Sequence, residues 1–447
     1  MVDLPRSEKT VTQTAGKDVA ARARRRISLR LLPFLFLLYV VCYVDRANVS
    51  FANLRMSVDL HFSDSVYGLG VGLFFLGYVL FEIPGAIIVE RWSARKWLAR
   101  IMITWGFFTI LNGFVHTARQ FYAARLLVGV AEASFFPGVI VYLTHWFPAK
   151  DRAKAIAFFY AAVPAASVIG SLLAGWLLQM HWLGLPGWRW IFVLEGILPL
   201  ILGIFTIFYL TDWPHQARWL PKEEADWISA ELKDETHAKK TIHDYTVWQS
   251  FRDRSVLLLT LAYFCAHVGA QGSTYFMPAF IRRLSGLPNS KVAFLVALPG
   301  LVGIAAMLLN SWHSDQTGER RWHAAGALLC AGLAYGLLPL ALSNFPAAMA
   351  LFIFGGGIMF AYYPVFWSMP TLVLSETAAA ACFGLINSIG HTGGLVGPYL
   401  VGSLNDRTHS LVPSFLLIAA CYLLAGSIIP GVRIRNPVPA TASLLSS

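Results

Sequence analysis

Charged residues are scarce in this chain. Asp, Glu, Lys and Arg make up 13% of its 447 residues, whereas soluble domains carry about 25%. Apolar residues account for 57% of the sequence, and the mean hydropathy is +0.59. So little charge argues against a soluble domain of this length and indicates an integral membrane protein.

Several chemical signatures are also missing. The sequence has no Gly-x-x-x-x-Gly-Lys-[Ser/Thr] phosphate loop, which argues against direct ATP drive. It has no His, Cys and acid cluster with metal-ligand spacing and no Ser, His and acid combination suited to hydrolysis. The five cysteines lie in apolar runs without clustering, as small core residues do: Cys42, Cys265, Cys330, Cys382 and Cys421. We therefore expect neither an enzyme nor a bound cofactor.

Long apolar runs fill most of the chain instead. Each approaches the roughly 20 residues that a membrane-spanning helix needs. Twelve such runs cover approximately 30–54, 66–90, 97–116, 120–147, 153–179, 189–211, 255–281, 291–313, 322–343, 346–373, 380–403 and 411–432. The sequence therefore predicts an all-α membrane protein with twelve transmembrane helices.

The basic residues indicate how these helices are oriented. Twelve spans place both termini on one side of the membrane, and 26 of the 35 Lys and Arg residues lie on that side, against seven on the other. The positive-inside rule then places both termini in the cytoplasm. Orientation accounts for the net charge of +11, so we expect no nucleic-acid partner. The first span is too long for a signal peptide and lacks a cleavage site, which predicts an uncleaved cytoplasmic tail.

The longest polar interruption divides the spans into two sets of six. It contains a segment from Lys222 that predicts a short surface helix. The predicted segments are a cytoplasmic tail 1–29, an N-terminal six-helix bundle 30–211, a cytoplasmic loop 212–254, a C-terminal six-helix bundle 255–432 and a cytoplasmic tail 433–447.

The two halves resemble each other. The loop after the second span, 90–96, and the loop after the eighth, 315–321, share the order acid, small residue, Arg and basic residue. Glycine patterns at 169–175 and 396–402 repeat at a similar offset. Repeats in the same orientation imply two bundles related by an axis along the membrane normal.

This organisation resembles the major facilitator superfamily over residues 30–432. The loop after the second span is similar to the signature of that superfamily, although Ala86, Glu90 and Ser93 replace its Gly, Asp and Gly. Acids and arginines at the cytoplasmic face can form a charge network that latches one conformation, with ordinary positive-inside charge as the alternative. The latch candidates are Glu90, Arg91, Arg95, Asp315 and Arg320.

Closer matches indicate one branch of the superfamily. The stretches 43–52, 129–138 and 385–390, with Gly397-Pro398, resemble the anion:cation symporter family. Bacterial members of that family carry tartrate, sugar acids, phthalates and related aromatic acids together with protons. The stretch 66–106 looks like the tartrate and phthalate branch. The resemblance implies a monomeric, proton-coupled importer of a small organic anion in the bacterial inner membrane.

Four ionisable residues lie inside the spans of the N-terminal half. Asp45 and Arg46 interrupt the first span, and Arg125 and Glu132 share one face of the fourth, about 10.5 Å apart along the helix axis. A charge at membrane depth costs roughly 2.5–3.5 kcal/mol on insertion scales, so such residues are functional candidates. Two acids and two bases balance each other if all are ionised. Which acid pairs with which arginine stays open.

The resemblance implies that Asp45 and Glu132 are proton-coupling acids and that Arg46 and Arg125 bind the anion. A guanidinium offers a planar fork that matches a carboxylate. Protonating an acid frees an arginine as the anion enters, so we expect the proton to be the coupling ion. For Arg125, which lies six residues beyond Arg119, outward snorkelling is the alternative.

Further polar and aromatic residues within the spans are candidates for substrate contacts, with helix packing as the alternative for each. They are Tyr43, Tyr78, Asn387, Gln271, Tyr275, Trp367 and His391. His267 and His391 both lie within spans, where a lone histidine is more often a packing residue than a proton carrier. Relatives often have Asn at the position of His391, which suggests selectivity for a more aromatic or more highly charged acid.

Three other functions remain to be weighed. An organic anion exchanger fits the same residues but does not need two titrating acids. A multidrug-type exporter favours acids over arginines in its cavity, which two intramembrane arginines argue against. A non-transporting membrane sensor would bind solute without flux. The sequence leaves open which carboxylate is carried and with how many protons.

Overall fold

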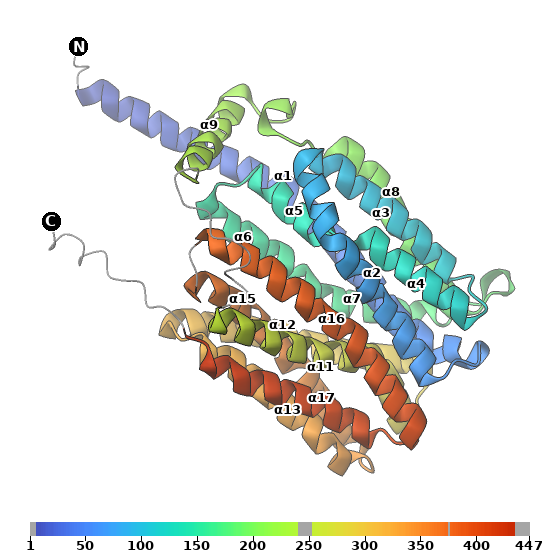
Figure 1. The fold of residues 1–447 in the computed structure, drawn as a ribbon. Helices are drawn as coiled ribbons and strands as arrows, with labels where there is room; N and C mark the ends of the chain where they lie inside the picture. The colour runs from blue at the N-terminus through green and yellow to red at the C-terminus, as the bar shows by residue number, and fades with distance from the viewer. Residues whose placement is uncertain (1–5, 240–252, 374–375, 434–447) are drawn as a thin grey trace.

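The computed structural model describes residues 6–239, 253–373 and 376–433, and the regular elements in these ranges are helical. The N-terminal half contains α1 (Arg6–Asp59), α2 (Asp64–Arg91), α3 (Ala94–Asn112), α4 (Ala118–Glu132), α5 (Phe135–Thr144), α6 (Ala149–Tyr160), α7 (Ala162–Leu177) and α8 (Gly187–Tyr209). The C-terminal half contains α11 (Arg254–Ser285), α12 (Asn289–Thr317), α13 (Arg321–Leu337), α14 (Phe345–Ile358), α15 (Tyr362–Val373), α16 (Glu376–Thr408) and α17 (Val412–Ile428). Figure 1 shows the two halves lying side by side.

These helices form the predicted twelve spans. Ten segments of the described chain are long and apolar enough to cross a membrane, with α4–α5, α6–α7 and α14–α15 each counted as one. Two further helices, α3 and α16, complete the set. The all-α fold with two six-helix bundles is therefore confirmed. The surface helix expected after Lys222 is α9 (Lys222–Lys239).

The apolar runs predict a single helix for the fourth span and for the fifth. In the structure, each of these two spans is broken into two helices. The fourth breaks between α4 and α5, where Ser134 has φ 67° in the left-handed region. The fifth breaks at Ala161, between α6 and α7. A broken helix is tolerated at membrane depth where neighbouring helices cover the freed backbone groups. The break after α4 directly follows Glu132, so it lies at the charged cluster described below.

The first helix extends far beyond its span. At 1.5 Å per residue, its 54 residues reach about 80 Å, whereas the hydrocarbon core is about 30 Å thick. The helix therefore runs through the expected boundary between tail and span at residue 30. In Figure 1 the part of α1 before its span crosses beside α9, and Arg26 lies 3.0 Å from Glu224 of α9. Arg24 joins the same part of α1 to α6, because it lies 2.7 Å from Asp151.

The two halves meet mainly through α2 against α16 and α7 against α12. Glycine permits close approach here, because a Cβ on Gly68 would lie 2.2 Å from the Pro398 carbonyl oxygen and one on Gly402 would lie 2.1 Å from the Asp64 carbonyl oxygen. At the end of α2 away from α9, Asp406 accepts hydrogen bonds from the backbone N–H groups of Asp64 (3.0 Å) and Ser65 (2.8 Å). Arg283 of α11 lies 2.6 Å from the Asp64 carboxylate. Polar contacts thus join the halves at this end.

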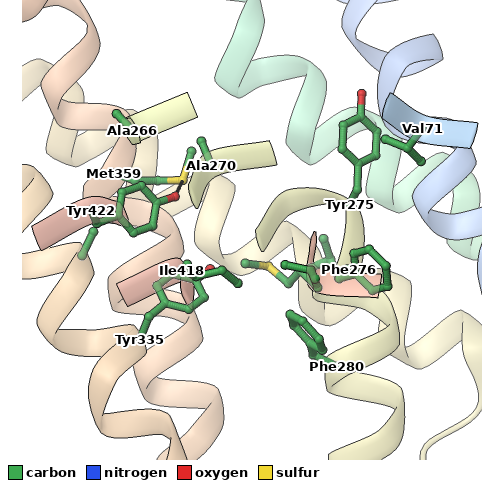
Figure 2. Close-up of a cluster of buried hydrophobic side chains, with 14 of the residues drawn as sticks. Val71, Ala266, Ala270, Tyr275, Phe276, Phe280, Tyr335, Met359, Ile418 and Tyr422 are labelled. Carbon is green, nitrogen blue, oxygen red and sulfur yellow. Dashed lines mark hydrogen bonds between the residues drawn. The ribbon is translucent and has the colours of Figure 1, made fainter. Parts of the chain in front are cut away.

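Aromatic side chains form much of the core of the C-terminal half. In Figure 2, the Tyr422 hydroxyl points to the Met359 sulfur, 3.0 Å away, while Tyr335 and Ile418 pack beside it. Phe276 and Phe280 continue this layer along α11. The Tyr275 hydroxyl points away from them, toward the N-terminal half. This packing gives α11 a fixed position from which its polar side chains can face the other bundle.

Candidate functional site

A buried ion pair links the first and fourth spans. Arg46 Nε on α1 lies 2.5 Å from Glu132 Oε1 on α4. Cys42, one turn earlier on α1, donates its thiol to the same oxygen at 3.1 Å. Glu132 is fully buried, and its second oxygen has no hydrogen-bond partner in the described structure. The pairing that the sequence left open is therefore Arg46 with Glu132.

Asp45 points to a different side of α1. Its carboxylate accepts hydrogen bonds from Thr109 on α3 at 3.0 Å and from Asn48 at 2.9 Å. Glu195 on α8 lies beside Asn48, within electrostatic reach of Asp45. Asp45 and Glu195 are both buried, so two acids occupy this side of the bundle. The sequence analysis missed Glu195, although the same rule on charges within spans would have found it.

Arg125 is buried rather than snorkelling outward. It is 2% exposed, and its Nε and Nη2 atoms have no hydrogen-bond partner among the described residues. The guanidinium lies 5.0 Å from the ring of Phe74, which supplies a cation–π contact but no counter-charge. Arg125 therefore presents an unsatisfied planar fork, whereas Arg46 already holds a carboxylate.

Aromatic rings surround the Arg46 guanidinium. The rings of Tyr43 and Tyr78 lie 5.0 and 4.9 Å from its Cζ atom, and that of Phe74 lies 5.6 Å away. Tyr43 and Tyr78 thus present ring faces to Arg46, while their contact with substrate stays a prediction. Phe74 lies against both arginines, which the sequence analysis did not anticipate.

Three candidates for substrate contacts in the C-terminal bundle lie on two helices, with Gln271 on α11 and both Asn387 and His391 on α16. Asn387 donates to Glu82 on α2 at 2.6 Å, and Ser388 approaches the second oxygen of Glu82 at 3.5 Å. Gln271 lies 3.1 Å from His267, whose ring lies 4.8 Å from that of His391. Glu82 is buried and, like Glu195, was missed as an acid inside a span.

Two other candidates lie in aromatic surroundings. The Tyr275 ring lies 6.1 Å from Phe75, and its carbonyl accepts a hydrogen bond from Tyr67 at 2.9 Å. Trp367 packs against Tyr263 at 5.0 Å between ring centres. Tyr275 thus lies at the contact between the halves, while Trp367 lies within the aromatic packing of the C-terminal half.

The latch candidates make contacts within their own halves. Arg95 donates its backbone N–H to Asp212 at 2.9 Å, and its side chain reaches the Ile207 carbonyl at 3.2 Å. Arg320 pairs with Asp315 at 2.6 Å. Arg91 is exposed, and the side chain of Glu90 lies outside the described part of the structure. The conformational role of these residues stays a prediction. Asp212, which accepts the hydrogen bond from Arg95, was not among the predicted latch residues.

Among the described residues, no group of three or more His, Cys, Asp or Glu side chains is placed to hold a metal ion. The site combines carboxylates and guanidinium groups, which bind anions and protons.

Comparisons with known proteins agree with the fold. Residues 35–398 match the Major Facilitator Superfamily. A "Putative tartrate transporter" from Agrobacterium vitis is 43% identical over 92% of this chain and 94% of its own. A "Quinolone resistance transporter" from Acinetobacter baumannii is 36% identical over 89% of this chain and 92% of its own. The inward-facing, unoccupied structure of a bacterial homologue of the lysosomal transporter Spinster superposes with a TM-score of 0.75, at 20% identity over 92% of this chain and 99% of its own.

The chain belongs to the major facilitator superfamily. It is a multi-pass transporter of small organic substrates in the bacterial inner membrane, and not an enzyme. The resemblance drawn from the motifs is confirmed, since two relatives with 43% identity are each named "Putative tartrate transporter".

Proposed function

We propose that this transporter imports a small organic anion together with protons, and that the anion is a carboxylate of the tartrate type. The observation that carries the proposal is the contrast between the two arginines of the charged cluster, Arg46 and Arg125. Arg46 is neutralised by Glu132, whereas Arg125 keeps an unpaired fork beside Phe74. A carboxylate fits such a fork with two parallel hydrogen bonds.

The acids supply a route for coupling. Protonation of Glu132 removes the charge that holds Arg46, and the free oxygen of Glu132 offers a place for the proton. Both arginines can then attract the entering anion. Because linkage is reciprocal, bound anion raises the proton affinity of Glu132 by the same factor. Asp45, held by Thr109 and Asn48, is the second candidate for a coupling acid.

Transport follows from the two-bundle architecture. The charged cluster belongs to the N-terminal half, and the facing polar residues on α11 and α16 belong to the C-terminal half. Rocking of one bundle against the other exposes a site between them to each side of the membrane in turn. The names of two relatives at 43% identity support a tartrate-like substrate.

Export of a drug-like compound is a second candidate, favoured by the relative named as a quinolone resistance transporter. Quinolones carry a carboxylate, so the arginines suit both classes of substrate. The direction of coupling separates the two: an importer accumulates its anion when the proton gradient points inward, and an exporter expels its compound under the same gradient.

Uptake into proteoliposomes tests the proposal. Purified protein is reconstituted, and radiolabelled tartrate, galactonate, glucarate and phthalate are offered with and without an inward proton gradient. We expect one of these anions to accumulate only when the gradient is imposed. Accumulation that ignores the gradient but rises with anion loaded inside would instead establish exchange. Loss of a preloaded quinolone from right-side-out vesicles under the inward proton gradient, without uptake of any anion, would establish export.

A further inference from the structure

Two histidines from different helices of the C-terminal half meet inside the protein. His267 on α11 and His391 on α16 have ring centres 4.8 Å apart at an interplanar angle of 84°. His267 is 3% exposed and His391 is 9% exposed. We call these two residues the histidine pair. The mechanism proposed above does not use it.

Gln271 is the hydrogen-bond partner of one of the rings. The Gln271 amide nitrogen lies 3.1 Å from His267 Nε2. In the orientation that the structure gives Gln271, the amide nitrogen donates and His267 Nε2 accepts, so that the ring carries its proton on Nδ1. That Nδ1 atom is buried and has no hydrogen-bond partner in the described structure, and the same is true of His391 Nδ1.

A buried N–H group without an acceptor is unfavourable, and native proteins seldom keep one without a reason. The neighbouring side chains do not remove this cost, because they present aromatic rings. Phe75 lies 5.9 Å from His267 and 6.3 Å from His391, and Tyr263 lies 5.3 Å from His267. The His267 N–H therefore lacks an acceptor that a ligand oxygen can supply, and the buried His391 Nδ1 beside it has no partner among the described residues either.

Only one layer of rings separates the histidine pair from the arginines. The Tyr78 ring lies 4.9 Å from the Arg46 Cζ atom and 5.4 Å from the His391 ring. The same layer contains Phe75, which lies beside both histidine rings and 5.1 Å from the ring of Phe74. The Phe74 ring in turn lies against the Arg125 guanidinium. The two sets of donors thus belong to opposite bundles and face each other across an aromatic wall.

We infer that the histidine pair binds the second carboxylate of a dicarboxylate substrate whose first carboxylate lies on Arg125. This inference rests on the proposed function and narrows its substrate class. Neutral imidazole N–H groups suit a second anionic group, because they donate hydrogen bonds without requiring a permanent counter-charge. A substrate held at both ends also bridges the two bundles, so its binding is coupled to their relative position.

Matched pairs of ligands test this assignment. The binding of tartrate is compared with that of glycerate, which lacks one carboxylate, and the binding of phthalate with that of benzoate, using the purified full-length protein in nanodiscs. For the wild type we expect a dicarboxylate to bind at least tenfold more tightly than its monocarboxylate partner. His267→Phe and His391→Phe should remove this preference while leaving the affinity for the monocarboxylate within about twofold.

A conservative variant distinguishes ligand binding from packing. His267→Asn keeps an N–H donor near the position of Nδ1 and should restore part of the preference for the dicarboxylate. His181→Asn, which changes an exposed histidine in the loop before α8, is the control and should change neither affinity. Equal binding of both ligands by the wild type, or equal loss of both in the His→Phe variants, would overturn this assignment. The proposed function would still stand. If the wild type bound none of the four anions, the proposed function would fall, and this assignment with it.

Discussion

Asn387 on α16 donates a 2.6 Å hydrogen bond to Glu82 on α2, so an amide of one bundle holds a buried carboxylate of the other. The second oxygen of Glu82 has only a longer contact of 3.5 Å, to Ser388. Asn387 was expected to contact substrate directly. In this conformation it is occupied by Glu82, so a substrate that reaches Asn387 has to displace that carboxylate.

A double-mutant cycle measures this bond. Asn387→Leu leaves the buried Glu82 carboxylate without its closest donor, which should lower the free energy of unfolding by on the order of 2–3 kcal/mol. The Glu82→Leu, Asn387→Leu double variant should lose at least about 1 kcal/mol less than the sum of the single changes. Unfolding by titration with SDS in mixed micelles gives these values. Glu82→Leu combined with Asn405→Leu, at the far end of α16, is the control and should be additive.

Glu132→Gln tests proton coupling. The amide keeps the size of the side chain and can still accept a hydrogen bond from Arg46, but it cannot release a proton. We expect loss of accumulation driven by the proton gradient, with exchange of internal for external anion kept to at least a third of the wild-type rate. Glu319→Gln, in the loop before α13, is the control. Full gradient-driven accumulation by the Glu132 variant would rule out Glu132 as an essential coupling acid.

Arg125→Lys tests the unpaired fork. Lysine keeps the charge but cannot form two parallel hydrogen bonds to a carboxylate, so the dissociation constant should rise at least about tenfold, or about 1.4 kcal/mol. Arg46→Lys should also weaken binding, but less, because Arg46 is already engaged by Glu132. The control is Arg119→Lys, an exposed position six residues earlier. Isothermal calorimetry with the transported anion gives the affinities, and an unchanged value for Arg125→Lys would exclude direct contact.

The sequence predicted the architecture well, because each part of it depends on a local pattern. The apolar runs give the number of spans, and the polar stretch 212–254 divides them. The central charges Asp45, Arg46, Arg125 and Glu132 were found because a charge inside an apolar run is conspicuous. These four residues do lie together in the structure.

The sequence could not predict which residues on different helices pair with each other. Spacing along α4 placed Arg125 and Glu132 on one face, yet Glu132 pairs with Arg46 of α1, because interhelical distance depends on packing that no local pattern records. Glu82 and Glu195 also lie inside apolar runs, at depths like that of Arg125, so the rule on charges within spans would have found them, although it would not have given their partners. The pairing of His267 with His391 joins residues 124 positions apart, which the sequence alone does not bring together.

Asp406 gives a prediction about pH. It lies beyond the predicted span 380–403, and hydrogen bonds from Ser65 and from the Asp64 N–H lower its pKa below the usual 3.8, although partial burial acts in the opposite direction. A carboxylate whose pKa is lower in the folded chain stabilises the fold at pH above 3.8, and this contribution disappears as the pH falls through the lowered value. Wild type should therefore melt at a higher temperature than Asp406→Asn at pH 7, and the difference should shrink below pH 4. A difference that did not change with pH would mean that the carboxylate charge contributes nothing to the junction.

Gly129 tests whether the charged cluster depends on close helix packing. A Cβ at this position of α4 would lie 2.0 Å from the Phe74 carbonyl oxygen and 2.8 Å from its carbonyl carbon, and backbone atoms cannot move aside as a side chain can. Gly129→Ala should push α2 away from α4 and lower the free energy of unfolding by about 1–3 kcal/mol. Because the Phe74 ring lies against both Arg125 and Arg46, anion affinity should fall as well.

Gly326→Ala is the matched control. A Cβ on Gly326 of α13 would have no atom within 4 Å, so alanine should be neutral there or stabilise the helix by about 0.5–1 kcal/mol. Anion affinity should stay at the wild-type value. If Gly129→Ala destabilised the protein while leaving affinity unchanged, the position of Phe74 would not matter for binding, and the arginines would hold the anion without the aromatic layer. A parallel loss of stability and affinity, confined to Gly129, would show that the approach of α2 to α4 positions the two guanidinium groups.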